Sequence, residues 1–141
     1  MKTKNINVKQ KLKDFFFENP TIKLRVRQIE RQVGVPLPSV IRYTKELEKE
    51  GILKSLQIAE IKVYSTDRSS RNFLLEKQFF NIKRLFDTGL VDFLIEKFSN
   101  STIIAFGSYA KGEDIESSDI DIYVESVSKQ KINLTKFEKI L

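Results

Sequence analysis

The sequence contains no cysteine and no histidine. It therefore cannot form disulfide bonds, thiolate or imidazole zinc sites, or the Ser-His and Cys-His pairs of many hydrolases. Any metal ion that the protein binds has to be a hard cation held by oxygen atoms, such as Mg²⁺ or Mn²⁺. No stretch approaches the roughly 20 apolar residues of a membrane-spanning helix. Because the first ten residues also lack an apolar signal core, we expect a cytoplasmic protein without membrane partners.

The net charge of +6 is concentrated in the first half of the 141-residue chain. Residues 1–68 carry 15 Lys and Arg against 8 Asp and Glu, whereas residues 69–141 carry 10 against 11. This asymmetry indicates two modules with different partners, and the basic module has the charge balance of a nucleic-acid binder. The overall composition, 40% hydrophobic and 31% charged, is typical of a soluble globular protein.

Residues 1–68 show helical periodicity three times and strand alternation twice. The first helix is expected to stop at residues 18–20, Glu-Asn-Pro, and the second at Gly34. The third is expected to run to about Glu50, before two short strands joined at residues 59–60. The helical residues predicted to face inward are Val8, Leu12, Phe15, Phe16, Val26, Ile29, Val33, Val40, Thr44 and Leu47.

Helices in this order, followed by a hairpin, form a winged helix-turn-helix pattern, and residues 26–68 resemble the winged helices of prokaryotic regulators. The resemblance implies that the third helix enters the major groove of double-stranded DNA while the wing holds phosphates. Winged helices also serve as dimerisation or protein-docking modules, and the mixed charges of the third helix are typical of an exposed, solvated surface. The DNA-contacting residues implied are Ser39, Arg42, Tyr43 and Lys45 on the helix, and Lys54 and Lys62 on the wing.

Residues 69–89 are predicted to form a connecting helix, followed after Gly89 by a second helical stripe up to Phe98. We expect the apolar face of the connecting helix to be core, because so many phenylalanines are most simply buried. A homodimer seam is the alternative. The residues of this face, at i, i+4, i+7 and i+11, are Leu75, Phe79, Ile82 and Phe86.

Residues 103–125, IIAFGSYAKGEDIESSDIDIYVE, place a Gly-Ser turn between two strand-like segments. Asp119 and Asp121 are two positions apart on the second segment, so they share one face of a strand. Two carboxylates this close repel each other unless a cation such as Mg²⁺ lies between them. A glycine turn that opens a helix offers backbone N–H groups and a hydroxyl to a phosphate. A metal and a phosphate site together suit phosphoryl or nucleotidyl transfer.

This joint pattern resembles the signature of polymerase-beta superfamily nucleotidyltransferases, in particular the minimal nucleotidyltransferases of archaea and bacteria. By that resemblance, Gly107 and Ser108 hold the triphosphate, while Asp119 and Asp121 are catalytic and hold the divalent ion. A hydroxyl then attacks the α-phosphorus of ATP or another nucleoside triphosphate and pyrophosphate leaves. Lys111 is a further candidate for phosphate binding, with a solvated lysine as the alternative. The matching positions are Gly107, Ser108, Ala110, Gly112, Ser118, Asp119, Ile120 and Asp121.

The predicted fold class is α/β (α+β): a winged helix-turn-helix at residues 1–68, a connecting helix at 69–89, and a small polymerase-beta-like nucleotidyltransferase domain with a mixed sheet at 90–141. The superfamily normally adds a third carboxylate on a later strand, and no candidate for it is visible after Glu125. We expect a domain shortened at its C-terminus. The alternatives are a site that works with two carboxylates and a site that has lost catalysis. The acidic residues Glu113, Asp114 and Glu116 are expected to form a solvated loop.

Three functions remain open from the sequence. The first, which we favour, is a metal-dependent nucleotidyltransferase joined to a DNA-binding winged helix. Minimal relatives commonly act beside a partner toxin protein, so a protein acceptor is implied by resemblance. The second is a DNA-binding transcriptional regulator whose back module only senses nucleotide. The third is a non-catalytic interaction protein that keeps the fold for dimerisation.

Overall fold

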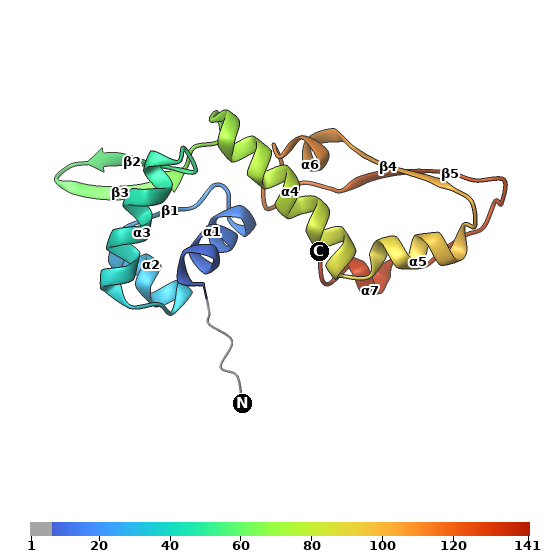
Figure 1. Cartoon of the computed structure of the whole chain (residues 1–141), viewed down its shortest axis with the longest axis horizontal. Coiled ribbons are helices and arrows are strands. Elements are labelled where there is room, and N and C mark those ends of the chain that lie inside the picture. The colour runs from blue at the N-terminus through green and yellow to red at the C-terminus, as the bar shows by residue number, and fades with distance from the viewer. Residues whose placement is uncertain (1–6) are drawn as a thin grey trace.

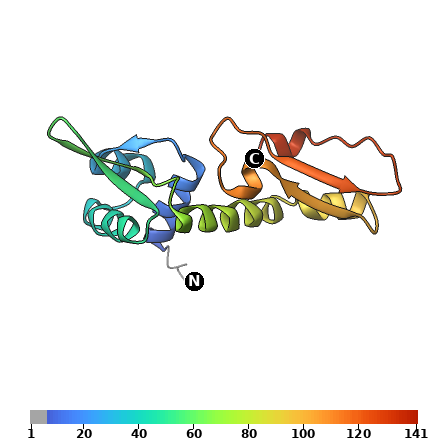
Figure 2. The same cartoon turned by 90° about the horizontal axis from the view of Figure 1, so that it is seen from above.

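The computed structural model describes residues 7–141, which form helices and two antiparallel sheets, and this confirms the α+β class. The first half of the chain lies at one end of an elongated molecule and the last third at the other (Figure 1). The helix α4 (Arg71–Asp87) runs between them and along one side of the molecule (Figure 2). No helix in the described part of the chain has the length and apolar content needed to cross a membrane.

The first half contains three helices and a three-stranded sheet of order β1-β3-β2, in which both pairings are antiparallel. Gly34 ends α2 in the left-handed region, with φ 72°, as its position after the last apolar residue predicted. The hairpin turns at Ala59, whose φ of 54° is also left-handed. The elements are α1 (Val8–Glu18), β1 (Lys23–Leu24), α2 (Val26–Val33), α3 (Leu37–Lys49), β2 (Leu53–Ile58) and β3 (Ile61–Thr66).

Most of the helical residues predicted to face inward do so. Leu12, Phe16, Ile29, Val40 and Leu47 are completely buried in one core. In α1 the buried pair is Phe16 and Phe17, and not the predicted Phe15 and Phe16. Phe15 is only half-buried, at the edge of the same core. The short strand β1 was not predicted, since two residues are too few to show alternation.

The prediction for the connecting helix was wrong about which face is buried. Leu75, Phe79, Ile82 and Phe86 are exposed, with between 40% and 67% of their surface accessible. The buried face of α4 consists of Phe73, Lys77, Asn81 and Leu85. Two of these residues are polar, so hydrophobic periodicity could not identify the face. Phe73 belongs to the core of the first half and Leu85 to the core of the second half.

The second half is a two-stranded antiparallel sheet with α5 and α7 on one side of it (Figure 1). The described residues therefore contain only antiparallel pairs, and not the mixed sheet that was predicted. Leu85, Leu90, Leu94, Tyr109 and Phe137 are buried in the core between sheet and helices. The elements are α5 (Leu90–Lys97), β4 (Thr102–Phe106), α6 (Gly107–Lys111), β5 (Asp121–Glu125) and α7 (Thr135–Glu138).

The end of α6 lies directly against α4 at Gly112. This glycine has a φ of 72°, and a Cβ built on it would lie 2.6 Å from the backbone oxygen of Leu74. It would also lie 3.2 Å from the Cβ of Lys77. Backbone atoms on α4 cannot move aside as a flexible side chain does, so only glycine fits this contact.

We expect Gly112→Ala to lower the free energy of unfolding by about 2–4 kcal/mol, because left-handed strain and overpacking both act there. Gly34→Ala is the matched control: its φ is also 72°, but nothing lies within 4 Å of the added Cβ. The control should lose only about 1 kcal/mol, from backbone strain alone. Urea unfolding of both variants measures the difference, and equal losses would contradict the importance of the α4–α6 contact.

Candidate functional site

The Gly-Ser turn and the second aspartate meet at the joined ends of β4 and β5. The strand register pairs Phe106, the last residue of β4, with Asp121, the first residue of β5. Gly107 follows with a φ of 72°, and a Cβ built on it would lie 2.4 Å from Oδ2 of Asp121. The carboxylate of Asp121 thus lies against the α-carbon of Gly107. The absence of a side chain at Gly107 is what allows this approach.

Both aspartates of this segment are exposed. Asp119, Asp121 and Tyr123 are exposed, whereas Ile120 and Ile122 between them are half-buried. Asp119 precedes β5 and does not take part in the ladder, in contrast to the prediction that both aspartates are strand residues. Within residues 7–141 no group of three or more acidic side chains is placed to hold a metal ion, so Asp119 and Asp121 have no third carboxylate beside them in such a cluster.

The other predicted phosphate-binding residues lie on α6. Ser108 is half-buried in its first turn, where backbone N–H groups have no partner within the helix. Lys111 ends α6 with an exposed side chain. Its backbone oxygen accepts a hydrogen bond of 3.1 Å from Nε2 of Gln78 on α4. Ser108 is therefore next to the Gly107–Asp121 contact, and Lys111 is at the opposite end of the short helix.

A buried polar network, which the sequence did not reveal, fixes α6 and the loop after it to α4. Nζ of Lys77 lies 3.0 Å from Oδ2 of Asp114 and donates a hydrogen bond of 2.9 Å to Oδ1 of Asn81. Nδ2 of Asn81 donates to Oδ1 of Asp114 at 2.7 Å and to the backbone oxygen of Tyr109 at 2.8 Å. The prediction that Asp114 belongs to a solvated loop was wrong, because only 7% of this residue is exposed.

Burial shifts the pKa values of two side chains in and beside this network. It lowers the pKa of Lys77, and the hydrogen bond and charge of Asp114 partly offset this effect. Burial raises the pKa of Tyr109 to about 12. The Tyr109 hydroxyl is therefore protonated at neutral pH, and it donates a hydrogen bond of 3.0 Å to the backbone oxygen of Asn81.

The same loop is held from its other side by the first half of the chain. Glu116 accepts hydrogen bonds from the backbone N–H of Thr21 at 3.0 Å and from its hydroxyl at 2.8 Å. Partial burial raises the pKa of Glu116, but the bonds from Thr21, a bond from its own backbone N–H and the charge of Arg68 together leave that pKa below its usual value. A guanidinium nitrogen of Arg68 donates to the backbone oxygen of Glu113 at 3.2 Å. Glu116 is thus part of a contact between the two halves of the chain.

The predicted DNA-contacting residues of α3 differ in exposure. Arg42 and Lys45 are exposed, and Nε of Arg42 lies 3.4 Å from Oε1 of Glu46. The Arg42 guanidinium also lies 5.3 Å above the ring of Tyr43, which packs in part against the first core. Ser39 is half-buried. Arg42 and Lys45 are therefore the two charged groups that this set presents freely to solvent.

The two wing lysines lie on opposite faces of the β2–β3 hairpin. Lys54 pairs with Ser65, whereas Lys62 pairs with Gln57, and successive pairs alternate in face. The face of Lys62 also carries Ser55, whose hydroxyl donates a hydrogen bond of 2.9 Å to Oε1 of Glu48 on α3. Lys62 is therefore on the α3 side of the hairpin and Lys54 on the far side.

When the chain is compared with known proteins, a match is found only in its second half. Residues 88–141 match the family model of the nucleotidyltransferase domain. This span contains the Gly-Ser turn of Gly107 and both aspartates, and it supports nucleotidyl transfer as the general chemistry of this region. No curated protein and no solved structure matches the chain.

We expect Gly107→Ala to weaken the binding of MgATP by at least about tenfold, because the new Cβ displaces the carboxylate of Asp121. Gly89→Ala is the matched control, since Gly89 has a φ of 83° but no atom within 4 Å of an added Cβ. Calorimetric titration of both folded variants measures the effect. Equal weakening in the two variants would mean that backbone strain, and not the contact with Asp121, is responsible.

Proposed function

We propose that residues 88–141 catalyse the metal-dependent transfer of a nucleoside monophosphate from ATP or another nucleoside triphosphate to a hydroxyl group. The acceptor oxygen forms a bond to the α-phosphorus and releases its proton to solvent, the bond from that phosphorus to the bridging oxygen breaks, and pyrophosphate leaves. The observation that carries this proposal is the contact between Gly107 and Asp121. It joins one of the two exposed aspartates to a turn of the type that binds phosphate, and Asp119 is two residues before Asp121 in the chain.

The donor set of the site fits a hard cation. Asp119 and Asp121 offer carboxylate oxygens, the ligands that Mg²⁺ and Mn²⁺ prefer, and both side chains are accessible. Such an ion, when bound, neutralises charge on the phosphate oxygens. The hydroxyl of Ser108 and the free N–H groups at the start of α6 would donate hydrogen bonds to the triphosphate. Lys111 would add a positive charge from the other end of α6.

A macromolecular acceptor suits the surface beside the aspartates. The exposed side of the sheet carries Ile104 opposite Tyr123 and Phe106 opposite Asp121. Ile104, Phe106 and Tyr123 are each about half exposed, at 47%, 50% and 51%. An open apolar surface next to a transfer site favours a protein hydroxyl over a small, fully enclosed acceptor. A side-chain hydroxyl of another protein is therefore the acceptor to test first.

The double substitution Asp119→Asn, Asp121→Asn is expected to abolish magnesium-dependent binding of ATP, with a loss of affinity above about tenfold, while preserving side-chain shape. Glu125→Gln is the matched control, because it makes the same chemical change on the same face of β5. Calorimetry measures binding, and transfer of label from α-phosphate-labelled ATP measures activity. Binding that persists in the double variant would contradict the proposed site. Magnesium-dependent binding without any pyrophosphate release would favour the nucleotide-sensing regulator.

We further propose that the module predicted at residues 1–68, of which the structure describes residues 7–68, is a winged helix that binds double-stranded DNA. The order of three helices and a three-stranded sheet supports this, as do the exposed Arg42 and Lys45 on α3. The position of Lys62 on the α3 side of the hairpin adds a third cation near that helix. Neutralised phosphates then provide affinity that falls with salt.

Lys62→Ala is expected to reduce the salt dependence of DNA binding by about one unit of slope, because one phosphate contact is lost. Lys54→Ala, the same change on the far face of the hairpin, should alter the slope less. Arg42→Ala and Lys45→Ala are expected to weaken binding as well. Fluorescence anisotropy with a duplex at several salt concentrations distinguishes these variants. A larger effect at Lys54 than at Lys62 would reverse the proposed orientation of the wing.

A further inference from the structure

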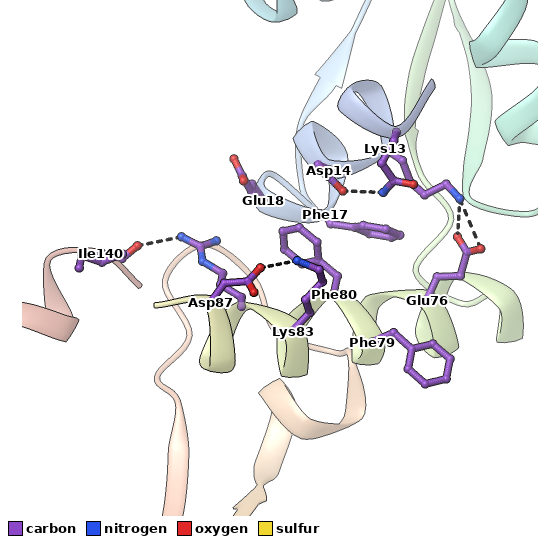
Figure 3. Close-up of a pocket in the computed structure, with 12 residues that line it drawn as sticks. Lys13, Asp14, Phe17, Glu18, Glu76, Phe79, Phe80, Lys83, Asp87 and Ile140 are labelled. Atoms are coloured by element: carbon purple, nitrogen blue, oxygen red, sulfur yellow. Dashed lines mark hydrogen bonds and ion pairs between the residues drawn. The ribbon is translucent and has the colours of Figure 1, made fainter. Parts of the chain in front are cut away.

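The exposed apolar face of α4 has no role in nucleotide or DNA binding as proposed above. We call Leu75, Phe79, Ile82 and Phe86 the α4 stripe. Their exposed fractions are 48%, 67%, 40% and 56%, although they are large apolar side chains on one helix face. Phe79 points away from α1, whereas Phe17 and Phe80 lie between the two helices (Figure 3). Leaving four such residues in water is unfavourable, so a partner that covers the stripe would stabilise the protein.

The spacing of the α4 stripe identifies the kind of partner. Successive members are separated by four, three and four positions, which is the a/d pattern of a coiled-coil seam. The spacing of four, three and four positions is the same when it is read from either end of the helix. A helix with such a stripe is therefore complementary to an antiparallel copy of itself, as an interface with two-fold symmetry requires.

We propose that the α4 stripe is the seam of a homodimer in which α4 pairs antiparallel with α4 of a second copy of the chain. In that alignment Leu75 lies opposite the partner's Phe86, and Phe79 lies opposite the partner's Ile82. The two-fold axis passes between Phe79 and Ile82. Each protomer then covers all four exposed side chains of the other.

The charges beside the α4 stripe agree with the antiparallel alignment. Glu76 follows Leu75 in the chain and Lys83 follows Ile82, so both lie on the same flank of the stripe. Antiparallel pairing places Glu76 next to the partner's Lys83, twice in the dimer. Glu76 is held in position by Lys13 on α1, with Nζ 3.1 Å from its Oε2. The side chain of Lys83 is 75% exposed and reaches only Asp87 on its own helix. Complementary charges of this kind select orientation more than they add affinity.

The flank that carries these charges is open. A cavity of about 750 Å³ lies between α1 and α4, and Glu76, Phe80 and Lys83 are among the residues that line it (Figure 3). The partner's Lys83 can therefore approach Glu76 without displacing α1. Four seam residues bury less area than a standard interface of roughly 800 Å² per partner, so we expect a dissociation constant of about micromolar order.

Sedimentation equilibrium of the full chain and of Phe79→Glu tests the seam. We expect the wild type to dimerise and Phe79→Glu to raise the dissociation constant at least about tenfold, since a charge would be buried at the centre. Ile95→Glu is the matched control, because Ile95 is 55% exposed on α5, outside the α4 stripe. An unchanged far-ultraviolet circular dichroism spectrum of Phe79→Glu would show that the fold is intact. A monomeric wild type, or equal dimerisation of wild type and Phe79→Glu, would overturn the proposal.

Cross-linking tests the orientation, and the absence of native cysteine makes it direct. Glu76→Cys and Lys83→Cys proteins are treated with a short bismaleimide, separately and as a mixture. Antiparallel pairing places the two Glu76→Cys sites of a dimer far apart, on opposite sides of the two-fold axis. It therefore predicts efficient cross-linking in the mixture and little in the Glu76→Cys protein alone. Cross-linking of Glu76→Cys alone that equals the cross-linking of the mixture would refute the antiparallel alignment. Lys83→Glu should weaken the wild-type dimer more than Lys129→Glu, which makes the same charge change outside the seam.

Discussion

The buried ion pair between Lys77 and Asp114 is the interaction on which the position of the candidate site depends. Both charges are removed from water, which is unfavourable unless each finds partners, and Asn81 supplies a hydrogen bond to each of them. Asn81 also binds the backbone of Tyr109 in α6. The network therefore joins α4 to α6, which begins at Gly107, and to the loop that leads to the aspartates. Without any one member, a buried polar group would lose its partner, and the turn and the loop would lose their common support.

The loop of residues 113–118 is held between two neighbours. Asp114 binds α4 from within the second half, and Glu116 binds Thr21 of the first half. The first half thus contacts the chain only a few residues before Asp119. The first half of the chain therefore directly supports a loop that leads to the candidate site. The two proposed activities share structural contacts as well as a chain.

The sequence predicted local features better than it predicted which surfaces are covered. Periodicity and Gly34 located α2 and α3, and the Gly-Ser and Asp-x-Asp pattern contained Gly107 and Asp121, which the β4–β5 register brings together. The α4 face was assigned wrongly, because periodicity shows which residues share a face but not which face is packed. Lys77 and Asn81 occupy the packed face, and the acidic partner Asp114 lies 37 positions from Lys77. The only sequence signal was a polar pair, Lys77 and Asn81, spaced by four between Phe73 and Leu85. Asp119 was predicted to be a strand residue but lies two residues before β5, because the alternation of apolar and polar residues in the sequence begins before the ladder does.

The contribution of α4 to both cores has a consequence for how the protein opens. Phe73 near its start is buried in the first core and Leu85 near its end in the second, so neither core is complete without the same helix. Helices of this length owe most of their stability to packing, and α4 would fray only if one of the cores released it. Its central amides, around Lys77 and Asn81, should therefore exchange with solvent deuterium as slowly as those of either core. The two halves would behave as one cooperative unit in spite of their separate surfaces.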